Sequence, residues 1–271
     1  MSERERARRR VATGLLLGSG LGWAGLLAAP DHALLLAFCR GDGGAWSWPS
    51  LRILLDAAPL APLAAHWALM LAAMMLPTLV SPLMHVHQRS FRQRRPRAFV
   101  LFLTGYIAVW MLAGVLLTLV HLSTNAALSP SASPPLWPAL VAAAVALVWQ
   151  CSPAKQRCLN RSHTHRALAA FGRAADRDAL AFGLEHALWC VGSCWALMLV
   201  PMLMAHGHLA AMLVVTAVMV AERLDAPAPL RWRLRGLGTA IRLLTARARH
   251  ARSRLLRLPR HSGAFKTASR A

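Results

Sequence analysis

The stretch AFVLFLTGYIAVWMLAGVLLTLVHL (98–122) contains no Asp, Glu, Lys or Arg. About 20 apolar residues are enough for a helix to cross the roughly 30 Å hydrocarbon core of a bilayer, so this run can span a membrane. The rest of the chain is similar, since 56% of its 271 residues are hydrophobic and only 15% are charged. Soluble domains carry roughly a quarter charged residues. The composition therefore predicts an all-α integral membrane protein, built as a bundle of membrane helices.

Six apolar runs are long enough, or nearly so, to be membrane spans. They are 11–29, 63–86, 98–122, 136–151, 180–206 and 208–222, of which the fourth and sixth are short. The first run follows the basic segment MSERERARRR (1–10), as the apolar part of a signal peptide would. Because no small-x-small cleavage site precedes Pro30, we expect this first span to remain uncleaved, which gives six spans in all.

The basic residues indicate how these spans are oriented. All Lys and Arg residues except Arg40 and Arg52 fall in four segments, which are 1–10, 87–97, 151–178 and 223–271. Six spans place these segments on one side of the membrane, and the positive-inside rule makes that side the cytoplasm. We therefore expect a protein of the bacterial inner membrane with both termini in the cytoplasm. Topology explains the net charge of +21, so the lipid bilayer is an expected partner and nucleic acid is not.

The chain divides into three parts by composition. Residues 1–62 hold the basic N-terminal segment, the first span and a periplasmic loop, and residues 63–223 form the main membrane domain. Residues 224–271 are a basic cytoplasmic tail, in which Leu and Ile recur at helical spacing over 231–257. This pattern is typical of a basic amphipathic helix on an anionic leaflet, but a disordered topogenic tail has the same composition.

Ligands for a soft metal recur at helical spacing in the second and fifth spans. In the second span they are His66, Met70, Met74 and Met75, and in the fifth His186, Cys190, Cys194 and Met198. Side chains four residues apart share one helix face. The midpoints of the two spans, near Met74 and Cys194, are expected at the same depth. The spacing therefore predicts a site between these spans.

Packing is the alternative explanation for each of these residues taken alone. Methionine is a common gap-filler in helix packing, and a single buried cysteine is often inert. His186 is harder to explain in this way, because an ionisable group inside a span is costly and usually functional. Imidazole and thiol groups also gather near the inner ends of the spans, at His85, His87, Cys158, His163 and His165.

Four segments resemble the DUF2182 family, which is described as predicted metal-binding integral membrane proteins. They are MLAAMMLP (70–77), GYIAVW (105–110), QCSPAKQRCL (150–159) and CVGSCWALM (190–198). The resemblance covers roughly 63–223, and some family members are called copper chaperones. The matching positions are Ala73, Met74, Met75, Pro77, Gly105, Tyr106, Trp110, Gln150, Lys155, Cys158, Leu159, Cys190, Gly192, Cys194, Trp195, Leu197, Met198 and Glu222.

Two positions depart from the family's pattern. Ser193 stands where the family has the first of two adjacent cysteines, and no second cysteine follows Cys158 within three or four residues. His163 and His165 could replace the missing thiol. If both missing cysteines are ligands in relatives, this chain binds metal more weakly, with a different geometry, or not at all.

The residues and the resemblance together predict a protein that binds copper for handling or delivery. Thiolate and thioether groups favour Cu(I), and zinc is the second choice because it prefers more imidazole or carboxylate. The expected ligands are His186, Cys190, Cys194, Met198, Met74, Met75, Met70 and Cys158, while Gly192, Trp195 and Pro77 shape the helix contact. A copper-dependent enzyme or another copper-handling protein is the expected partner.

Two other functions are compatible with the same residues. The ligands distributed across the bilayer would also suit a metal transporter, which needs access from both faces in turn. A membrane assembly factor, in which His and Cys merely pack, would need no metal. An enzyme is not expected, because the sequence shows no nucleophile–base pair, phosphate-binding glycine loop or H-E-x-x-H zinc motif.

Overall fold

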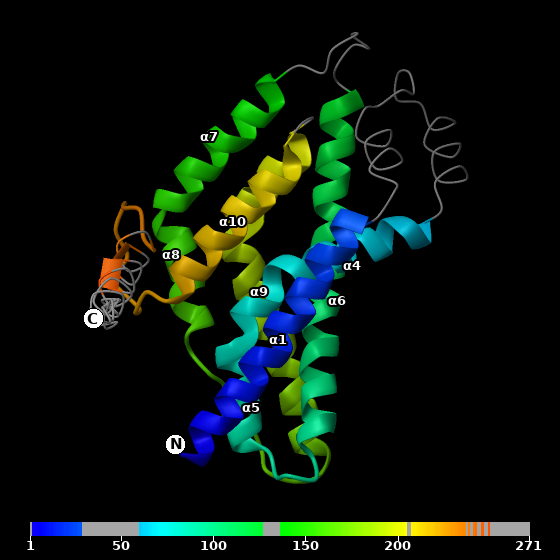
Figure 1. The fold of residues 1–271 in the computed structure, drawn as a ribbon, viewed down its shortest axis with the longest axis vertical. Coiled ribbons are helices and arrows are strands. Elements are labelled where there is room, and N and C mark those ends of the chain that lie inside the picture. Colours follow the sequence, from blue (N-terminus) through cyan, green and yellow to red (C-terminus); the bar gives the residue numbers. More distant parts are fainter. Residues whose placement is uncertain are drawn as a thin grey trace, which may run out of the picture.

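The structure is a computed structural model that describes residues 2–28, 60–126, 136–204 and 207–236, with single positions from Gly238 to Arg249. In these ranges all regular secondary structure is helical, which confirms the all-α class (Figure 1). The elements are α1 (Glu3–Ala28), α4 (Leu60–Met75), the 3-10 helix η1 (Leu76–Leu79), α5 (Val80–Arg89), α6 (Arg95–Ala126), α7 (Trp137–Cys151), α8 (Pro153–Ser162), α9 (Gly172–Leu203) and α10 (His208–Arg223).

Four stretches of helix are long and apolar enough to cross a membrane. They are Glu3–Ala28, Ala64–Arg89, Arg95–His121 and Gly172–Leu203, and they match the first, second, third and fifth predicted spans. Large apolar side chains on their outer faces are exposed, for example Leu17, Leu21 and Leu112, as expected for contact with lipid. The described part of the chain is therefore consistent with a membrane protein.

The expected count of six spans is not reached in the described ranges. The fourth predicted span forms α7, which ends after 15 residues, and α8 continues from it at an angle of 67°. Pro153 explains the break, because the residue before a proline is disfavoured in the helical conformation. Ser152 instead caps α8, and its side chain accepts a hydrogen bond from the Lys155 N–H at 3.1 Å. The sixth predicted span forms α10, which has 16 residues.

Helix α9 packs chiefly on α6, and two glycines allow their backbones to touch. A Cβ added at Gly183 would lie 2.1 Å from the carbonyl oxygen of Phe102, and one added at Gly105 would lie 2.5 Å from that of Leu180. Small residues let membrane helices approach closely, and dispersion forces then hold them together. This contact sets the position of every side chain on the buried face of α9.

Helix α1 packs on α4 and η1 and supplies a hydrogen bond that a proline leaves unmade. Pro77 has no N–H to donate to the carbonyl oxygen of Ala73, and the Ser19 hydroxyl donates to that oxygen at 2.6 Å. The Thr78 hydroxyl donates to the Met75 carbonyl at 2.7 Å. Backbone groups in lipid must be satisfied within the protein, so these hydroxyls stabilise the irregular turn. Pro77 thus shapes this span, as expected.

Residues 225–235, which we call the C-terminal strap, lie against α8. The Asn160 side chain donates to the Ala228 carbonyl at 2.7 Å and accepts from the Ala228 N–H at 3.2 Å. Gln156 pairs in the same way with the backbone of Arg231 and also donates to the Arg233 carbonyl. Residues 231–235 are therefore held in a non-helical conformation, which differs from the amphipathic helix considered over 231–257, and most of the remainder of that range lies outside the described residues.

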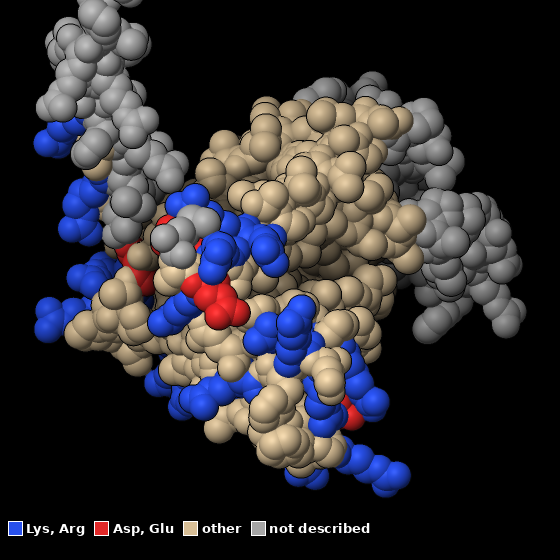
Figure 2. Space-filling model, turned by 60° about the horizontal axis from the view of Figure 1, so that its bottom comes forward, with Lys and Arg blue, Asp and Glu red and all other residues tan. Residues whose placement is uncertain are grey.

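Lys and Arg side chains gather on one end of the molecule, shown facing forward in Figure 2. The start of α1, the turn between α5 and α6, and the start of α9 all lie at this end in Figure 1. Arg94 and Arg97 each form an ion pair of 2.7 Å with Asp176, which ties that turn to α9. These three parts of the chain belong to basic segments that the span count and the charge pattern predict on one side of the membrane.

Replacing Gly183 with alanine is expected to lower the stability of the bundle. The new methyl group would overlap the Phe102 carbonyl, so α6 and α9 must separate, at a cost of about 1–3 kcal/mol in the free energy of unfolding. Gly20→Ala is the matched control, because a Cβ at Gly20 of α1 meets nothing within 4 Å. Thermal unfolding of the purified protein in detergent should show a loss for Gly183→Ala alone; equal melting temperatures would contradict the close contact.

Candidate metal-binding site

The four predicted ligands of α9 lie on its buried face. His186 is 3% exposed, Cys190 1%, Cys194 2% and Met198 0%. Their spacing of four residues, close to one helical turn, keeps consecutive members on the same side of the helix. The line of donors predicted from the sequence is therefore a line of buried donors in the structure.

The methionines predicted from the second span are buried in the same core. Met70, Met74 and Met75 lie on α4 and belong to one hydrophobic cluster with Cys190 and Cys194. Helix α4 itself packs mainly on α1, whereas α9 packs mainly on α6. The two predicted spans therefore contribute to one side-chain cluster without extensive direct packing of α4 on α9, and both of these helices contact α6 and α10.

Tyr106 of α6 contacts the candidate ligand Cys190, a contact that the sequence did not predict. Its hydroxyl lies 3.3 Å from the Cys190 Sγ, within hydrogen-bond distance. The Cys194 thiol donates to the Cys190 carbonyl at 3.0 Å. Tyr106 is the only tyrosine of the chain and sits in the GYIAVW motif, so a signal was present. Its contact with Cys190 depends on the α6–α9 packing, which the spacing of residues within one helix does not predict.

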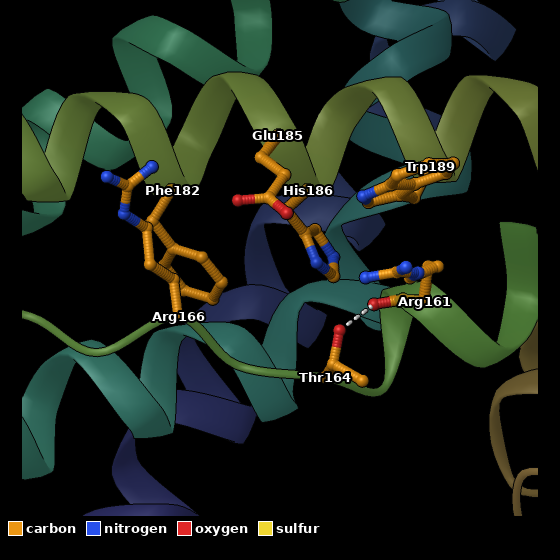
Figure 3. Close-up of a pocket in the computed structure, with 7 residues that line it drawn as sticks. All are labelled: Arg161, Thr164, Arg166, Phe182, Glu185, His186 and Trp189. Carbon is orange, nitrogen blue, oxygen red and sulfur yellow. Dashed lines mark hydrogen bonds between the residues drawn. The ribbon is translucent and has the colours of Figure 1, made fainter.

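His186 borders a small pocket between α9 and the segment that follows α8, with room for about one water molecule. Figure 3 shows its ring projecting from α9 toward the segment around Thr164. The His186 Nε2 atom is buried and has no hydrogen-bond partner. Since buried polar atoms are nearly always paired, such an atom in a pocket suits a ligand or an unplaced water. The other residues that line the pocket are Arg161, Thr164, Arg166, Phe182, Glu185 and Trp189.

Cys158 of α8 lies against α9 at Gly192. Its Sγ would be only 2.8 Å from a Cβ at Gly192, and the Gly192 carbonyl accepts from the Trp149 indole N–H at 3.0 Å. The Trp149 ring also packs edge-to-face against the Trp195 ring, with the ring centroids 5.3 Å apart. Gly192 and Trp195 thus shape the contact of α9 with α7 and α8, not the predicted contact between the second and fifth spans. The Cys158 side chain is half-buried, whereas Cys190 and Cys194 are fully buried.

A buried polar cluster lies beside the thiols and was not predicted as a unit. Lys155 forms an ion pair with Glu222, and both side chains are almost completely buried. The Gln150 amide also donates to the Glu222 carboxylate at 2.7 Å. Each of these residues matched a family motif separately, on three different elements. Only the bend between α7 and α8 brings Lys155 back toward the end of α10.

Two histidines outside the candidate spans are expected to be uncharged at neutral pH. Burial lowers the pKa of His163, with smaller contributions from Arg223 and Arg235. Burial also lowers the pKa of His165, as does the neighbouring His85, whose ring centroid is 4.8 Å away. Neutral imidazole is the form that binds metals. These rings lie near Phe182 and His186, at the His186 end of the α9 line.

The donor types limit which metal the described residues suit. No group of three His, Cys, Asp or Glu side chains within the described ranges is arranged to hold one ion. An ion on the α9 line would therefore use methionine sulfur in addition to the thiols. Thiolate and thioether are the ligands that select Cu(I). Two further side chains of donor type, His206 and Cys39, lie outside the described residues.

The fold is helical, with long apolar helices of the kind that cross membranes and with cysteine and methionine side chains buried in the core. The copper chaperone family PpoB2 matches this chain over residues 64–245, and the chain belongs to that family. The matched range includes α4 to α10 and the C-terminal strap, and family membership implies a non-catalytic role in copper handling. No curated protein and no solved structure matches the chain.

Removing one member of the Lys155–Glu222 pair is expected to destabilise the protein strongly. Lys155→Met leaves a buried carboxylate without its counter-charge, and such changes cost about 3–5 kcal/mol in the free energy of unfolding. The double variant Lys155→Met/Glu222→Gln keeps an acceptor for Gln150 and buries no charge, so it should lose less than Lys155→Met alone. Chemical unfolding in detergent measures these costs. A double variant that loses the sum of the two single costs would show that the pair is not coupled.

Proposed function

We propose that this protein is an integral membrane copper chaperone that holds Cu(I) in its core for delivery to a copper-dependent enzyme or another copper-handling protein. The observation that carries the proposal is the buried line His186, Cys190, Cys194 and Met198, in a chain that belongs to a copper chaperone family. The resemblance of the same segments to DUF2182 metal-binding proteins supports it. Cys190 and Cys194 would supply thiolates and His186 an imidazole, although these three side chains are not gathered around one point in the described residues.

Methionine sulfur would complete the coordination. Met198 continues the α9 line, and Met74 and Met75 enter the same cluster from α4, with Met70 one turn further along. Cys158, which contacts α9 at Gly192, would bind the ion as it moves to this site. A buried thiolate without a counter-charge is costly, and a bound cation removes that cost. Zn²⁺ fits less well, because it favours more imidazole or carboxylate than these residues provide.

We further propose that the protein crosses the bacterial inner membrane six times, with both termini in the cytoplasm. Helices α7 and α10 have 15 and 16 residues, which corresponds to roughly 22–24 Å at 1.5 Å per residue. Such helices are shorter than the hydrocarbon core, but local thinning of the bilayer accommodates short spans at modest cost. The basic end in Figure 2 would face the cytoplasm under the positive-inside rule.

A metal transporter is the second candidate, because imidazole side chains lie between the basic end of the molecule and the two buried cysteines. His85, His163 and His165 lie at that end, and His186 separates them from Cys190. A chaperone needs one accessible site, whereas a transporter must open to both faces in turn. Copper uptake into sealed proteoliposomes distinguishes them, since a chaperone binds copper at the membrane without accumulating it inside.

Cys190→Ser and Cys194→Ser are each expected to lose most of the bound Cu(I), because each removes a thiolate ligand. Met198→Leu should lose part of it, since one thioether is replaced by an apolar side chain of similar size. Cys151→Ser is the control, because Cys151 ends α7 and does not belong to the buried cluster. Copper retained after desalting under reducing conditions, measured by elemental analysis, gives the result.

Two results would contradict this assignment of ligands. If both serine variants keep the copper of the wild-type protein and change only its stability, the cysteines are packing residues. If the wild-type protein keeps no stoichiometric copper, the proposed ligand set is wrong, and Ser193, where the family has a cysteine, is the first position to change.

A further inference from the structure

Arg223, the last residue of α10, reaches the turn of α9 that carries the two thiols. Its Nη2 lies 3.5 Å from the Ser193 Oγ, and the Ser193 hydroxyl donates to the Cys190 carbonyl at 2.7 Å. Ser193 is itself buried between Cys190 and Cys194 in the chain. The guanidinium group is part-buried rather than solvated at the surface. Its charge is therefore directed toward the candidate site.

The charge of the Arg223 guanidinium also interacts with the other candidate ligands of α9. It interacts with Cys190 and Cys194, and with His186 one helical turn before them. Among the residues that the structure describes, Lys155 and Glu222 also lie near the thiols, and they form an ion pair whose charges cancel. Within this described part of the chain, the positive charge of Arg223 is thus left without an ion-pair partner beside the two cysteines.

This single charge favours one charge type of metal complex. When the two neutral thiols bind a monovalent ion, they release two protons to the solvent and form a unit of charge −1, whereas a divalent ion on the same two thiolates forms a neutral unit. A nearby cation stabilises the negative unit and has little effect on the neutral one. Because charge interactions are stronger in a protein interior than in water, the difference should be measurable.

We propose that Arg223 is a specificity-determining residue of the copper site, which favours monovalent soft ions over divalent ones by balancing the charge of the metal–dithiolate unit. The inference rests on the proposed function, because it takes Cys190 and Cys194 as the thiolate ligands. It adds a role for a residue that is not a ligand. Methionine and neutral imidazole ligands carry no charge, so their participation does not alter the balance.

The test compares Ag⁺, a monovalent soft ion that is stable in air, with Cd²⁺, a divalent soft ion. The affinity of each is measured by competition with a chelator, on the full-length protein in detergent under reducing conditions. Arg223→Gln should weaken Ag⁺ binding at least about tenfold, equivalent to about 1.4 kcal/mol, and change Cd²⁺ binding less than about twofold. Arg223→Lys keeps the charge and should keep most of the Ag⁺ affinity.

Arg173→Gln is the matched control, since it removes an exposed arginine from the start of the same helix α9. It should leave both affinities unchanged, and Cd²⁺ binding by Arg223→Gln shows that this variant still folds. Equal losses of Ag⁺ and Cd²⁺ in Arg223→Gln, or no loss of either, would overturn the inference while leaving the proposed function in place. A wild-type protein that binds neither ion would overturn the proposed function and this inference with it.

Discussion

The thiols of α9 can stand beside Tyr106 only because α9 touches α6 at the level of the backbone. Gly183 and Gly105 leave no room for a side chain at this contact. The contact buries His186 and Cys190 against the aromatic face of α6, where Phe102 and Tyr106 lie about 6 Å from the imidazole ring. Any larger residue at either glycine would move this whole face away from the donors. The candidate site is therefore built on a helix contact made by residues that carry no chemistry themselves.

The second constraint is the need to satisfy polar groups inside an apolar bundle. Ser19 and Thr78 bond the carbonyls near Pro77, and Gln150 and Lys155 surround the Glu222 carboxylate. The C-terminal strap bonds to Asn160 and Gln156 on the outer side of α8. Many polar residues of the core are thus arranged in pairs or clusters, whereas the His186 Nε2 and the indole nitrogens of Trp110 and Trp189 are buried without a hydrogen-bond partner among the described residues.

Residue spacing was enough to predict the helical class, four of the candidate spans and the line from His186 to Met198. These features depend on periodicity within one helix, which a sequence shows directly. The short α7 was harder to predict, because an apolar run continues to Cys151 and only Ser152 and Pro153 mark its end. The contacts of Cys190 with Tyr106, and of Lys155 with Glu222, could not be predicted from spacing. They depend on which helices pair and on the 67° bend between α7 and α8.

The central claim is that sulfur atoms in the core of this protein hold Cu(I). X-ray absorption at the copper K edge, recorded on full-length protein loaded with Cu(I) under reducing conditions, tests it most directly. The account predicts a first coordination shell dominated by sulfur, with at most one nitrogen from His186. A shell made only of nitrogen and oxygen would contradict it, because copper would then be bound away from Cys190 and Cys194.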